Sequence, residues 1–177
     1  MDPSSGNKIG NSVSLPGSLY MAVSQIRFND RLLVGSYGSV YCYDTSNYNL
    51  LWTNELSGCG YHFGVSLSLL YEYGTALIVG FHGHVVSINP NSGKTNWTLS
   101  LPGSGYGFVS VVIRKNTIIA VSKGYLYAID ASGSILLKDG LSGLGYGDAI
   151  IGSKDGEDQN SSNLIFARLS AREHRSH

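Results

Sequence analysis

The most closely spaced histidines in this sequence are His82 and His84, separated by one glycine. Residues two apart on a strand point to the same face, so such a pair could bind a metal ion. However, the glycine between them is typical of a turn. The matching positions of two similar segments hold other residue types, Tyr37 with Ser39 and Lys123 with Tyr125. We therefore interpret the pair as a solvated turn and predict no metal site.

No other group of residues in the sequence predicts catalysis. The chain has five histidines, two of them in its last residues, and they suggest no serine, histidine and aspartate set of the kind that activates a nucleophile. Four acidic residues gather late in the chain, at Asp148, Asp155, Glu157 and Asp158. Their spacing does not fit a known calcium loop, which favours a solvated loop. The sequence therefore predicts a non-enzymatic protein without a cofactor.

Four tyrosines recur at intervals of 41, 45 and 40 residues: Tyr20, Tyr61, Tyr106 and Tyr146. Two interpretations stay open for them. The one we favour is that each tyrosine packs the inner strand of its own repeat. The other is that the tyrosines form a ring at the mouth of the fold and stack on a sugar or a peptide. Both can hold, because tyrosine has an apolar body and a polar tip.

These tyrosines close a motif that marks a longer repeat. Its copies are Leu56-Ser-Gly-Cys-Gly-Tyr61, Leu101-Pro-Gly-Ser-Gly-Tyr106 and Leu141-Ser-Gly-Leu-Gly-Tyr146, with a looser copy at Leu15-Pro-Gly-Ser-Leu-Tyr20. A period of about 40 residues is typical of solenoids, arrays and propellers. The sequence therefore predicts an architecture built from repeated structural units.

Each copy of the repeat predicts four short strands joined by turns. In the third copy these strands are expected at 108–113, 117–121, 125–130 and 135–141. Continuous apolar runs this short are typical of strands buried on both faces. Cys42 occupies a third-strand position that holds a serine or an alanine in the other copies, so we expect it to be a core residue and not a reactive thiol.

Four strands per copy, without helical periodicity, describe a four-stranded antiparallel blade. The predicted fold class is all-β, a β-propeller-like array with about three complete blades and a partial fourth. A β-solenoid is the alternative, but its coils are usually shorter. The predicted organisation is a disordered segment at 1–14, a partial propeller at 15–167 and a disordered basic tail at 168–177. Within the propeller we expect blades at 15–56, 57–101 and 102–141 and a partial blade at 142–167.

The fourth-strand region carries a more specific pattern. In Asp44-Thr-Ser-Asn-Tyr-Asn-Leu-Leu-Trp52 and Asn89-Pro-Asn-Ser-Gly-Lys-Thr-Asn-Trp97, a tryptophan follows Asp or Asn by eight residues. This pattern resembles the PQQ-like repeat, whose family is named after quinoprotein alcohol dehydrogenases and includes many propellers without the cofactor. The resemblance implies that Trp52 and Trp97 dock adjacent blades against each other. The third copy departs from it, with Lys138 at the equivalent place.

The composition narrows the class of partner. Charged residues make up 14% of the chain and the net charge is zero, which argues against a nucleic-acid protein with its basic stripe. No apolar run approaches the ~20 residues of a membrane span, and the start lacks a signal-peptide pattern. The cytoplasm is therefore the default location, and secretion is the alternative if the N-terminus is incomplete. Two cysteines make no disulfide framework. We interpret the glycosylation patterns at Asn96 and Asn160 as chance matches.

These observations predict a binding or scaffold propeller that recognises a partner protein, a peptide or a glycan with its strand-connecting loops. Closed propellers have about four to eight blades, so three blades and a part should leave an apolar face that invites self-association. The alternative is a fragment of a larger PQQ-like propeller, similar to a quinoprotein dehydrogenase, without independent function. For that alternative no cofactor or metal ligands can be placed in the sequence.

Overall fold

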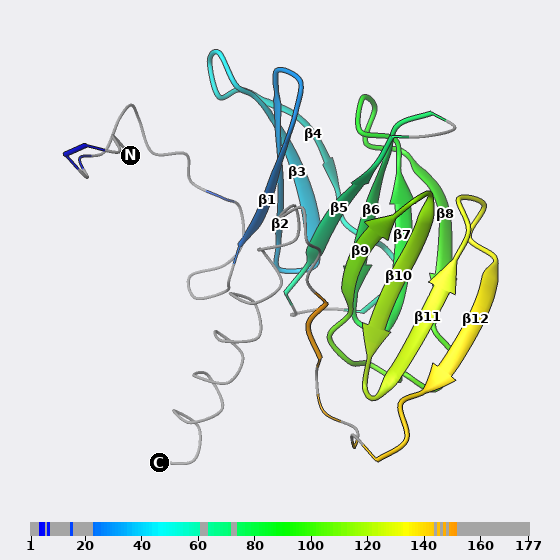
Figure 1. Ribbon diagram of the computed structural model, residues 1–177. Coiled ribbons are helices and arrows are strands. Elements are labelled where there is room, and N and C mark those ends of the chain that lie inside the picture. Colours follow the sequence, from blue (N-terminus) through cyan, green and yellow to red (C-terminus); the bar gives the residue numbers. More distant parts are fainter. Residues whose placement is uncertain are drawn as a thin grey trace.

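Twelve strands form three four-stranded antiparallel sheets in the part of the chain that the structure describes (Figure 1). This computed structural model describes residues 4, 5, 7, 15, 23–60, 64–71, 74–143, 145, 147 and 149–151. Within these ranges the regular structure is all β, and no helix occurs. The predicted fold class, an all-β array of propeller blades, is confirmed.

Each sheet is built from four strands that are consecutive in the chain and hydrogen-bonded in chain order. The first sheet contains β1 (Ser24–Phe28), β2 (Arg31–Ser36), β3 (Ser39–Asp44) and β4 (Leu50–Asn54). The second contains β5 (Ser66–Leu70), β6 (Ala76–Phe81), β7 (His84–Ile88) and β8 (Thr95–Ser100). The third contains β9 (Ser110–Arg114), β10 (Thr117–Ser122), β11 (Tyr125–Ile129) and β12 (Ile135–Gly140).

The turn between the last two strands of each sheet begins at an Asp or Asn side chain, as the sequence predicts. Asp44 Oδ1 accepts the backbone N–H of Ser46 over 2.7 Å, and Asp130 Oδ1 accepts that of Ser132 over 2.9 Å. Asn89 does the same in the second sheet. Such Asx turns reverse the chain without help from the rest of the fold, because the acceptor lies two residues from the donor.

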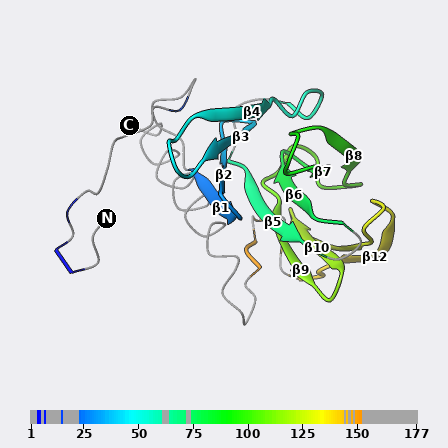
Figure 2. The ribbon, with the colours of Figure 1, turned by 90° about the horizontal axis from the view of Figure 1, so that it is seen from above.

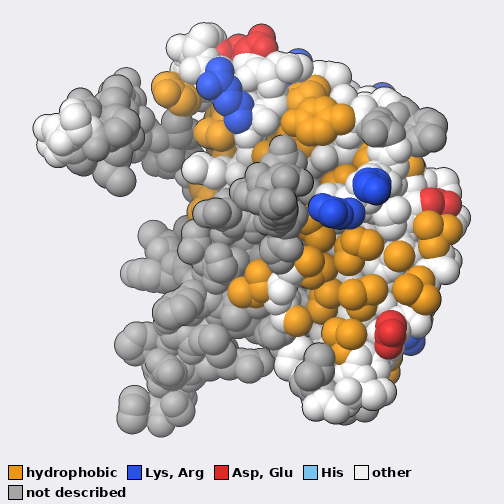
Figure 3. Space-filling model, viewed as in Figure 1, with side chains coloured by type: hydrophobic (Ala, Val, Ile, Leu, Met, Phe, Trp, Pro, Cys, Tyr) orange, Lys and Arg blue, Asp and Glu red, His pale blue; other side chains and the backbone are white. Residues whose placement is uncertain are grey.

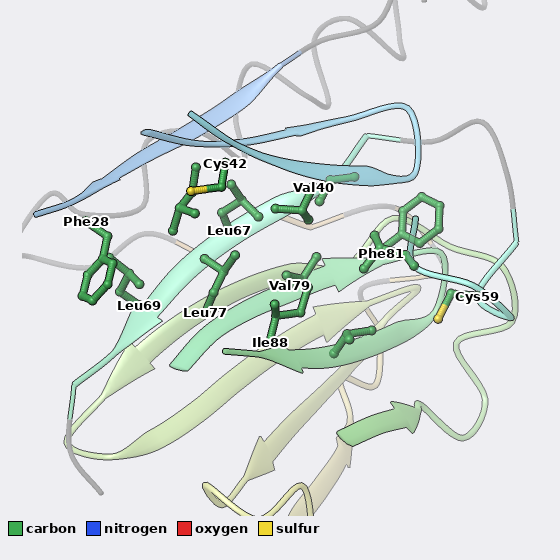
Figure 4. Close-up of a cluster of buried hydrophobic side chains, with 14 residues drawn as sticks. Phe28, Val40, Cys42, Cys59, Leu67, Leu69, Leu77, Val79, Phe81 and Ile88 are labelled. Atoms are coloured by element: carbon green, nitrogen blue, oxygen red, sulfur yellow. The ribbon is translucent and has the colours of Figure 1, made fainter. Parts of the chain in front are cut away.

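Neighbouring sheets touch through their first strands, β1 with β5 and β5 with β9. Viewed from above, the sheets fan out with these strands on the inner side and with β4, β8 and β12 outside (Figure 2). Apolar side chains fill the space between the first two sheets (Figure 4). A second cluster fills the space between the second and third sheets. Cys42 is fully buried in the first cluster, which confirms its prediction as a core residue.

A buried serine at the start of each inner strand binds the next sheet. Ser24 Oγ donates to the carbonyl oxygen of Val65, and Ser66 Oγ donates to that of Val109 over 2.6 Å. Both serines are at most 1% exposed. Since a buried hydroxyl without a partner costs free energy, these bonds also fix how far apart the inner strands can stand.

A glycine opposite each of these serines lets the next sheet approach. Gly35 pairs with Ser24, and Gly80 pairs with Ser66. A Cβ on Gly35 would stand 2.8 Å from the Cγ1 of Val65, and a Cβ on Gly80 would stand 2.6 Å from the carbonyl oxygen of Val109. Both distances are shorter than real Cβ contacts, so only glycine fits at these two positions.

The third sheet continues this arrangement with a difference. Ser110 Oγ accepts the backbone N–H of Ile151 over 3.2 Å, which brings the beginning of the predicted fourth copy beside β9. The residue opposite Ser110 is Val121 and not glycine. Most of the predicted partial blade, and the predicted tail at 168–177, lie outside the described residues, as does most of 1–14.

The outward face of the third sheet is largely apolar. Leu136 is 62% exposed and Leu137 is 54% exposed, and hydrophobic side chains gather over β9 to β12 (Figure 3). The predicted self-association through such a face stays a prediction. No helix in the described part of the chain has the length and apolarity to cross a membrane.

We predict that Gly80→Ala destabilises the protein by about 1–3 kcal/mol, the usual cost of overpacking. The added methyl must displace the carbonyl of Val109 or the hydroxyl of Ser66, and both are buried. Urea unfolding followed by circular dichroism measures the change. Gly147→Ala is the matched control, because no heavy atom lies within 4 Å of its added Cβ. Equal stability of the two variants would contradict the close approach of the sheets.

Candidate functional site

The two ends of the blades differ in what they carry. One end holds the Asx turns and the turns between the first two strands of each sheet. The other end, which we call the connection end, holds the turns at 37–38, 82–83 and 123–124 and the sheet-to-sheet connections at 55–65 and 101–109. This is the lower end in Figure 1. Because the connection end combines short turns with longer loops, it offers the most varied surface of the fold.

Three equivalent turn positions at the connection end hold large side chains in a left-handed backbone conformation. The φ angles are 50° at Tyr37, 48° at His82 and 45° at Lys123, and a glycine with positive φ follows each. Positive φ at both central residues is the requirement of a type I′ hairpin turn, where Asn-Gly and Gly-Gly are favoured. Tyrosine and lysine are uncommon in this conformation. The backbone is therefore the same in all three turns while the side chains differ.

His82 is not part of a solvated turn, so that interpretation of the sequence was wrong. Its side chain is only 8% exposed, and Nδ1–H donates to the carbonyl oxygen of Cys59 over 2.7 Å. His84 Nδ1 lies 3.0 Å from the carbonyl oxygen of His82. Since carbonyls only accept hydrogen bonds, both Nδ1 atoms carry protons. Within the described ranges no three His, Cys, Asp or Glu side chains gather as they would around a metal ion.

Tyr106 lies on the surface of the connection end and does not pack the inner strand of its blade. Its ring stacks on the imidazole of His82, with 4.7 Å between ring centroids and an interplanar angle of 18°. The residue is nevertheless 71% exposed. A stacked ring keeps its orientation, so Tyr106 is a preformed aromatic platform. The other three tyrosines of the predicted ring, Tyr20, Tyr61 and Tyr146, lie outside the described residues.

Two lysines flank the loop that carries Tyr106. The Nζ atom of Lys123 lies 4.0 Å from the point where a Cβ of Gly105 would stand, and its Cγ lies 2.7 Å from the same point of Gly107. On the other side, Lys138 Nζ lies 4.3 Å from the ring centroid of Tyr125. Loop, lysines and tyrosine together form a basic and aromatic surface.

The structure places both predicted docking tryptophans against the next sheet. Trp52 Nε1–H donates to the carbonyl oxygen of Pro90 over 3.2 Å, and Trp97 Nε1–H donates to that of Ala131 over 3.0 Å. A Cβ on Gly93 would stand 2.6 Å from the Trp52 ring, and one on Gly133 would stand 2.8 Å from the Trp97 ring. Both tryptophans are half-buried. Each indole therefore rests on the Asx-turn glycine of the following sheet.

The register shows that Leu137, and not Lys138, is equivalent to the two tryptophans. Trp52 pairs with Cys42, Trp97 pairs with Ser87, and Leu137 pairs with Ala128. The third Asx turn is one residue shorter, since Asp130 N–H donates to Ser134 where Asn89 N–H donates to Lys94. In the third copy, the position equivalent to the tryptophans is therefore seven residues after the Asp and not eight.

The two thiols and the tyrosine hydroxyl that are buried in the hydrophobic clusters stay protonated at neutral pH. Burial raises the pKa of the Cys42 and Cys59 thiols. Burial and the neighbouring Tyr125 raise the pKa of Tyr127 to about 12, and its hydroxyl donates to the carbonyl oxygen of Pro102 over 2.8 Å. None of these groups is poised as a nucleophile or a base. The acidic segment from Asp155 to Asp158 lies outside the described residues.

A family model described as "Outer membrane protein assembly factor BamB", of the PQQ-like type, matches residues 1–169. The chain belongs to this family. Its PQQ-like β-propeller fold explains why the Asx turn, its glycine and the tryptophan recur together at sheet contacts. A search of curated proteins finds no match.

Solved structures share the fold of this PQQ-like chain at low sequence identity. BamB from Moraxella catarrhalis is 18% identical with a TM-score of 0.51, and the match covers 66% of this chain and 34% of that one. Quinohemoprotein alcohol dehydrogenase from Comamonas testosteroni is 19% identical with a TM-score of 0.54, covering 84% and 24%. The computationally designed Ika8 protein is 16% identical with a TM-score of 0.55, covering 77% and 42%. The chain thus spans less than half the length of each.

Sequence reasoning missed three groups of residues that the structure brings together. These are the inner-strand serines with their glycines, the Leu137 position, and the lysines around the Tyr106 loop. A signal for the first was present, because Ser24, Ser66 and Ser110 each begin an apolar strand in successive copies. The lysines had no such signal, since they meet the loop only through folding.

We predict that Trp97→Ala lowers the free energy of unfolding by about 3 kcal/mol, near the lower end for truncated aromatic core residues. The variant loses the bond to Ala131 and the contact with Gly133. Leu137→Ala is the control at the equivalent position, where a leucine that is 54% exposed should cost little. Equal losses in both variants, measured by urea unfolding, would contradict the docking role.

We also predict an acid-sensitive turn at Asp130. Its pKa lies below the ordinary value of 3.8, first because the Ser132 hydroxyl donates to the carboxylate and then because backbone N–H groups do. A lowered folded pKa gives stability that is fully present above 3.8 and is lost as the pH falls through the folded value. Asp130→Asn keeps a side-chain oxygen acceptor but cannot be protonated in this range. The melting temperature of this variant should therefore fall less as the pH is lowered. Asn89→Asp is the reciprocal variant, and its melting temperature should fall more steeply as the pH is lowered. If neither variant changes the dependence of the melting temperature on pH, the prediction is wrong.

Proposed function

We propose that this chain contributes blades to a non-enzymatic binding propeller, which recognises a partner protein, a peptide or a glycan at the connection end. One observation carries the proposal. Tyr37, His82 and Lys123 occupy the same strained turn position in three otherwise equivalent sheets. Tyr37 and Lys123 are half-buried there, whereas His82 is buried and stacks on the exposed Tyr106. A repeat that keeps its backbone and varies the side chain at one turn position is typical of a recognition surface.

The backbone strain at these same turn positions adds a second argument for this proposal. Non-glycine residues with positive φ cost free energy, and such strain gathers where side chains are needed for function. At Lys123 an asparagine would satisfy the I′ turn better than lysine. The lysine therefore stands there at a cost in stability, and binding is the function that we assign to it.

The comparisons favour a role as part of a larger propeller. The match to BamB covers 34% of that chain, and the family description names an assembly factor of outer membrane proteins. We propose by analogy that partners bind this propeller while it performs no reaction itself. Its loops would then act as docking surfaces between other proteins or their glycans.

A second candidate rests on the other structural relatives. Europium-containing methanol dehydrogenase is 14% identical with a TM-score of 0.50, and the match covers 64% of this chain and 23% of that one. A fragment of a quinoprotein dehydrogenase-like propeller would need carboxylate and amide ligands for its metal ion. Among the described residues, no three His, Cys, Asp or Glu side chains gather as they would around such an ion. A quinone titration followed by visible absorption distinguishes this candidate from a binding propeller.

The proposed function predicts opposite effects of one substitution on stability and binding. Lys123→Asn creates an Asn-Gly turn and should raise the melting temperature by about 2–4 °C, the effect of roughly 1 kcal/mol in a chain of this size. The same substitution should weaken the binding of ligands that are found by screening the full chain against peptide and glycan arrays. Lys115→Asn is the control, because Lys115 also has positive φ, at 44°, but lies at the other end of the third sheet.

Two results would contradict the proposed function. One is that no array ligand depends on any of the three turn positions. The other is that Lys123→Asn and Lys115→Asn change binding equally, since a recognition surface at the connection end cannot include the turn between β9 and β10.

A further inference from the structure

The loop from Pro102 to Gly107 combines an aromatic platform with a cation that has no carboxylate beside it. One face of Tyr106 is held by His82, and the residue as a whole is 71% exposed. The half-buried Lys123 lies along Gly107 and ends near Gly105, the residues on either side of Tyr106. Throughout the described part of the chain, no ion pair involves this lysine.

The geometry points to a specific ligand class. We infer that this loop binds a glycan whose sugars carry carboxylates, with one sugar ring stacked on Tyr106 and its carboxylate near Lys123 Nζ. The inference deepens the proposed function and rests on it, because it names the ligand of the same connection end. We call this surface, made of Tyr106, His82, Lys123 and the loop, the Tyr106 platform.

The aromatic ring explains the preference for a sugar. A tyrosine ring offers an apolar face and a polar tip, which suits a pyranose with an apolar C–H face and hydroxyls at its edge. Because His82 fixes the ring beforehand, binding does not have to order it. A peptide would usually need an unpaired strand edge or a groove. Residues 101–109 form turns and loop in place of a strand, so the platform offers no strand edge.

The lysine explains the preference for a negative charge. The net charge of these 177 residues is zero, so the chain does not attract anions through its net charge. Any preference for an acidic sugar must then come from local cations. Lys123 supplies one, and Lys138 lies on the other side of the loop, over Tyr125. An ammonium group binds a carboxylate as a point charge, which tolerates different sugar geometries.

The test uses the full chain, titrated calorimetrically with a tetramer of galacturonic acid. Its fully methyl-esterified form is the matched neutral ligand, and hexaglutamate is the acidic peptide. We expect the acidic tetramer to bind at least about threefold more tightly than its ester, and more weakly as salt rises. Tyr106→Ala should weaken binding about tenfold, the upper range for a lost aromatic contact. Lys123→Gln should weaken it about two- to fivefold, as for an exposed ion pair.

Matched controls separate the Tyr106 platform from general effects of charge and aromaticity. Tyr48→Ala removes a tyrosine that is 46% exposed at the Asx-turn end, and Lys115→Gln removes an exposed lysine in a left-handed turn. Both should bind the acidic tetramer like the unaltered chain. Melting temperatures show whether each variant is folded, and the exposure of Tyr106 makes its truncation safe for folding.

Three outcomes would overturn the inference: equal binding of tetramer and ester, tighter binding of hexaglutamate, or equal effects of the platform and control variants. If the tetramer does not bind, but an array ligand of another class binds and loses affinity in the Tyr106 or Lys123 variant, the inference is wrong and the proposed function stands. If no ligand depends on the connection end, both fall.

Discussion

The close approach of neighbouring sheets at their inner strands is the constraint on which the rest of this structure depends. Buried serine hydroxyls bind the carbonyls of the following sheet, and Gly35 and Gly80 leave the space that this requires. Farther out, each tryptophan rests on the next Asx-turn glycine. Contacts near the axis and at the periphery thus use glycine for the same reason, since any side chain would push the sheets apart.

This constraint leaves little freedom inside the blades and concentrates variation at their ends. The strands must keep small and apolar residues, whereas the I′ turns must keep only their backbone conformation. Tyr37, His82 and Lys123 show how far the side chains diverge under that rule. In the proposed function, recognition would rest on a few turn and loop positions that a rigid scaffold holds at fixed distances.

The architecture could be predicted from the sequence because each copy repeats local signals: apolar runs, Asx turns and turn glycines. The site could not, because its contacts join residues that are far apart in the chain and meet only through folding. His82 looks solvated when its turn is considered alone, but contacts with other segments bury it, among them the carbonyl of Cys59 and the ring of Tyr106. The misplaced equivalence of Lys138 has another origin, a turn shortened by one residue, which spacing alone does not reveal. Register, once strands are paired, corrects it to Leu137.

Val121 breaks the pattern of glycines at the inner contacts of the array. At the first two contacts a glycine faces the following sheet, which lets the two sheets approach closely at their inner strands. At the third sheet a valine takes that place opposite Ser110, whose hydroxyl oxygen accepts the backbone N–H of Ile151. A Cβ on Gly35 or Gly80 would stand 2.8 Å or 2.6 Å from atoms of the following sheet, so a sheet packed against β9 and β10 would have to stand farther from Val121 than the third sheet stands from Gly80. A propeller closed through such a contact would depart from exact rotational symmetry at the third blade.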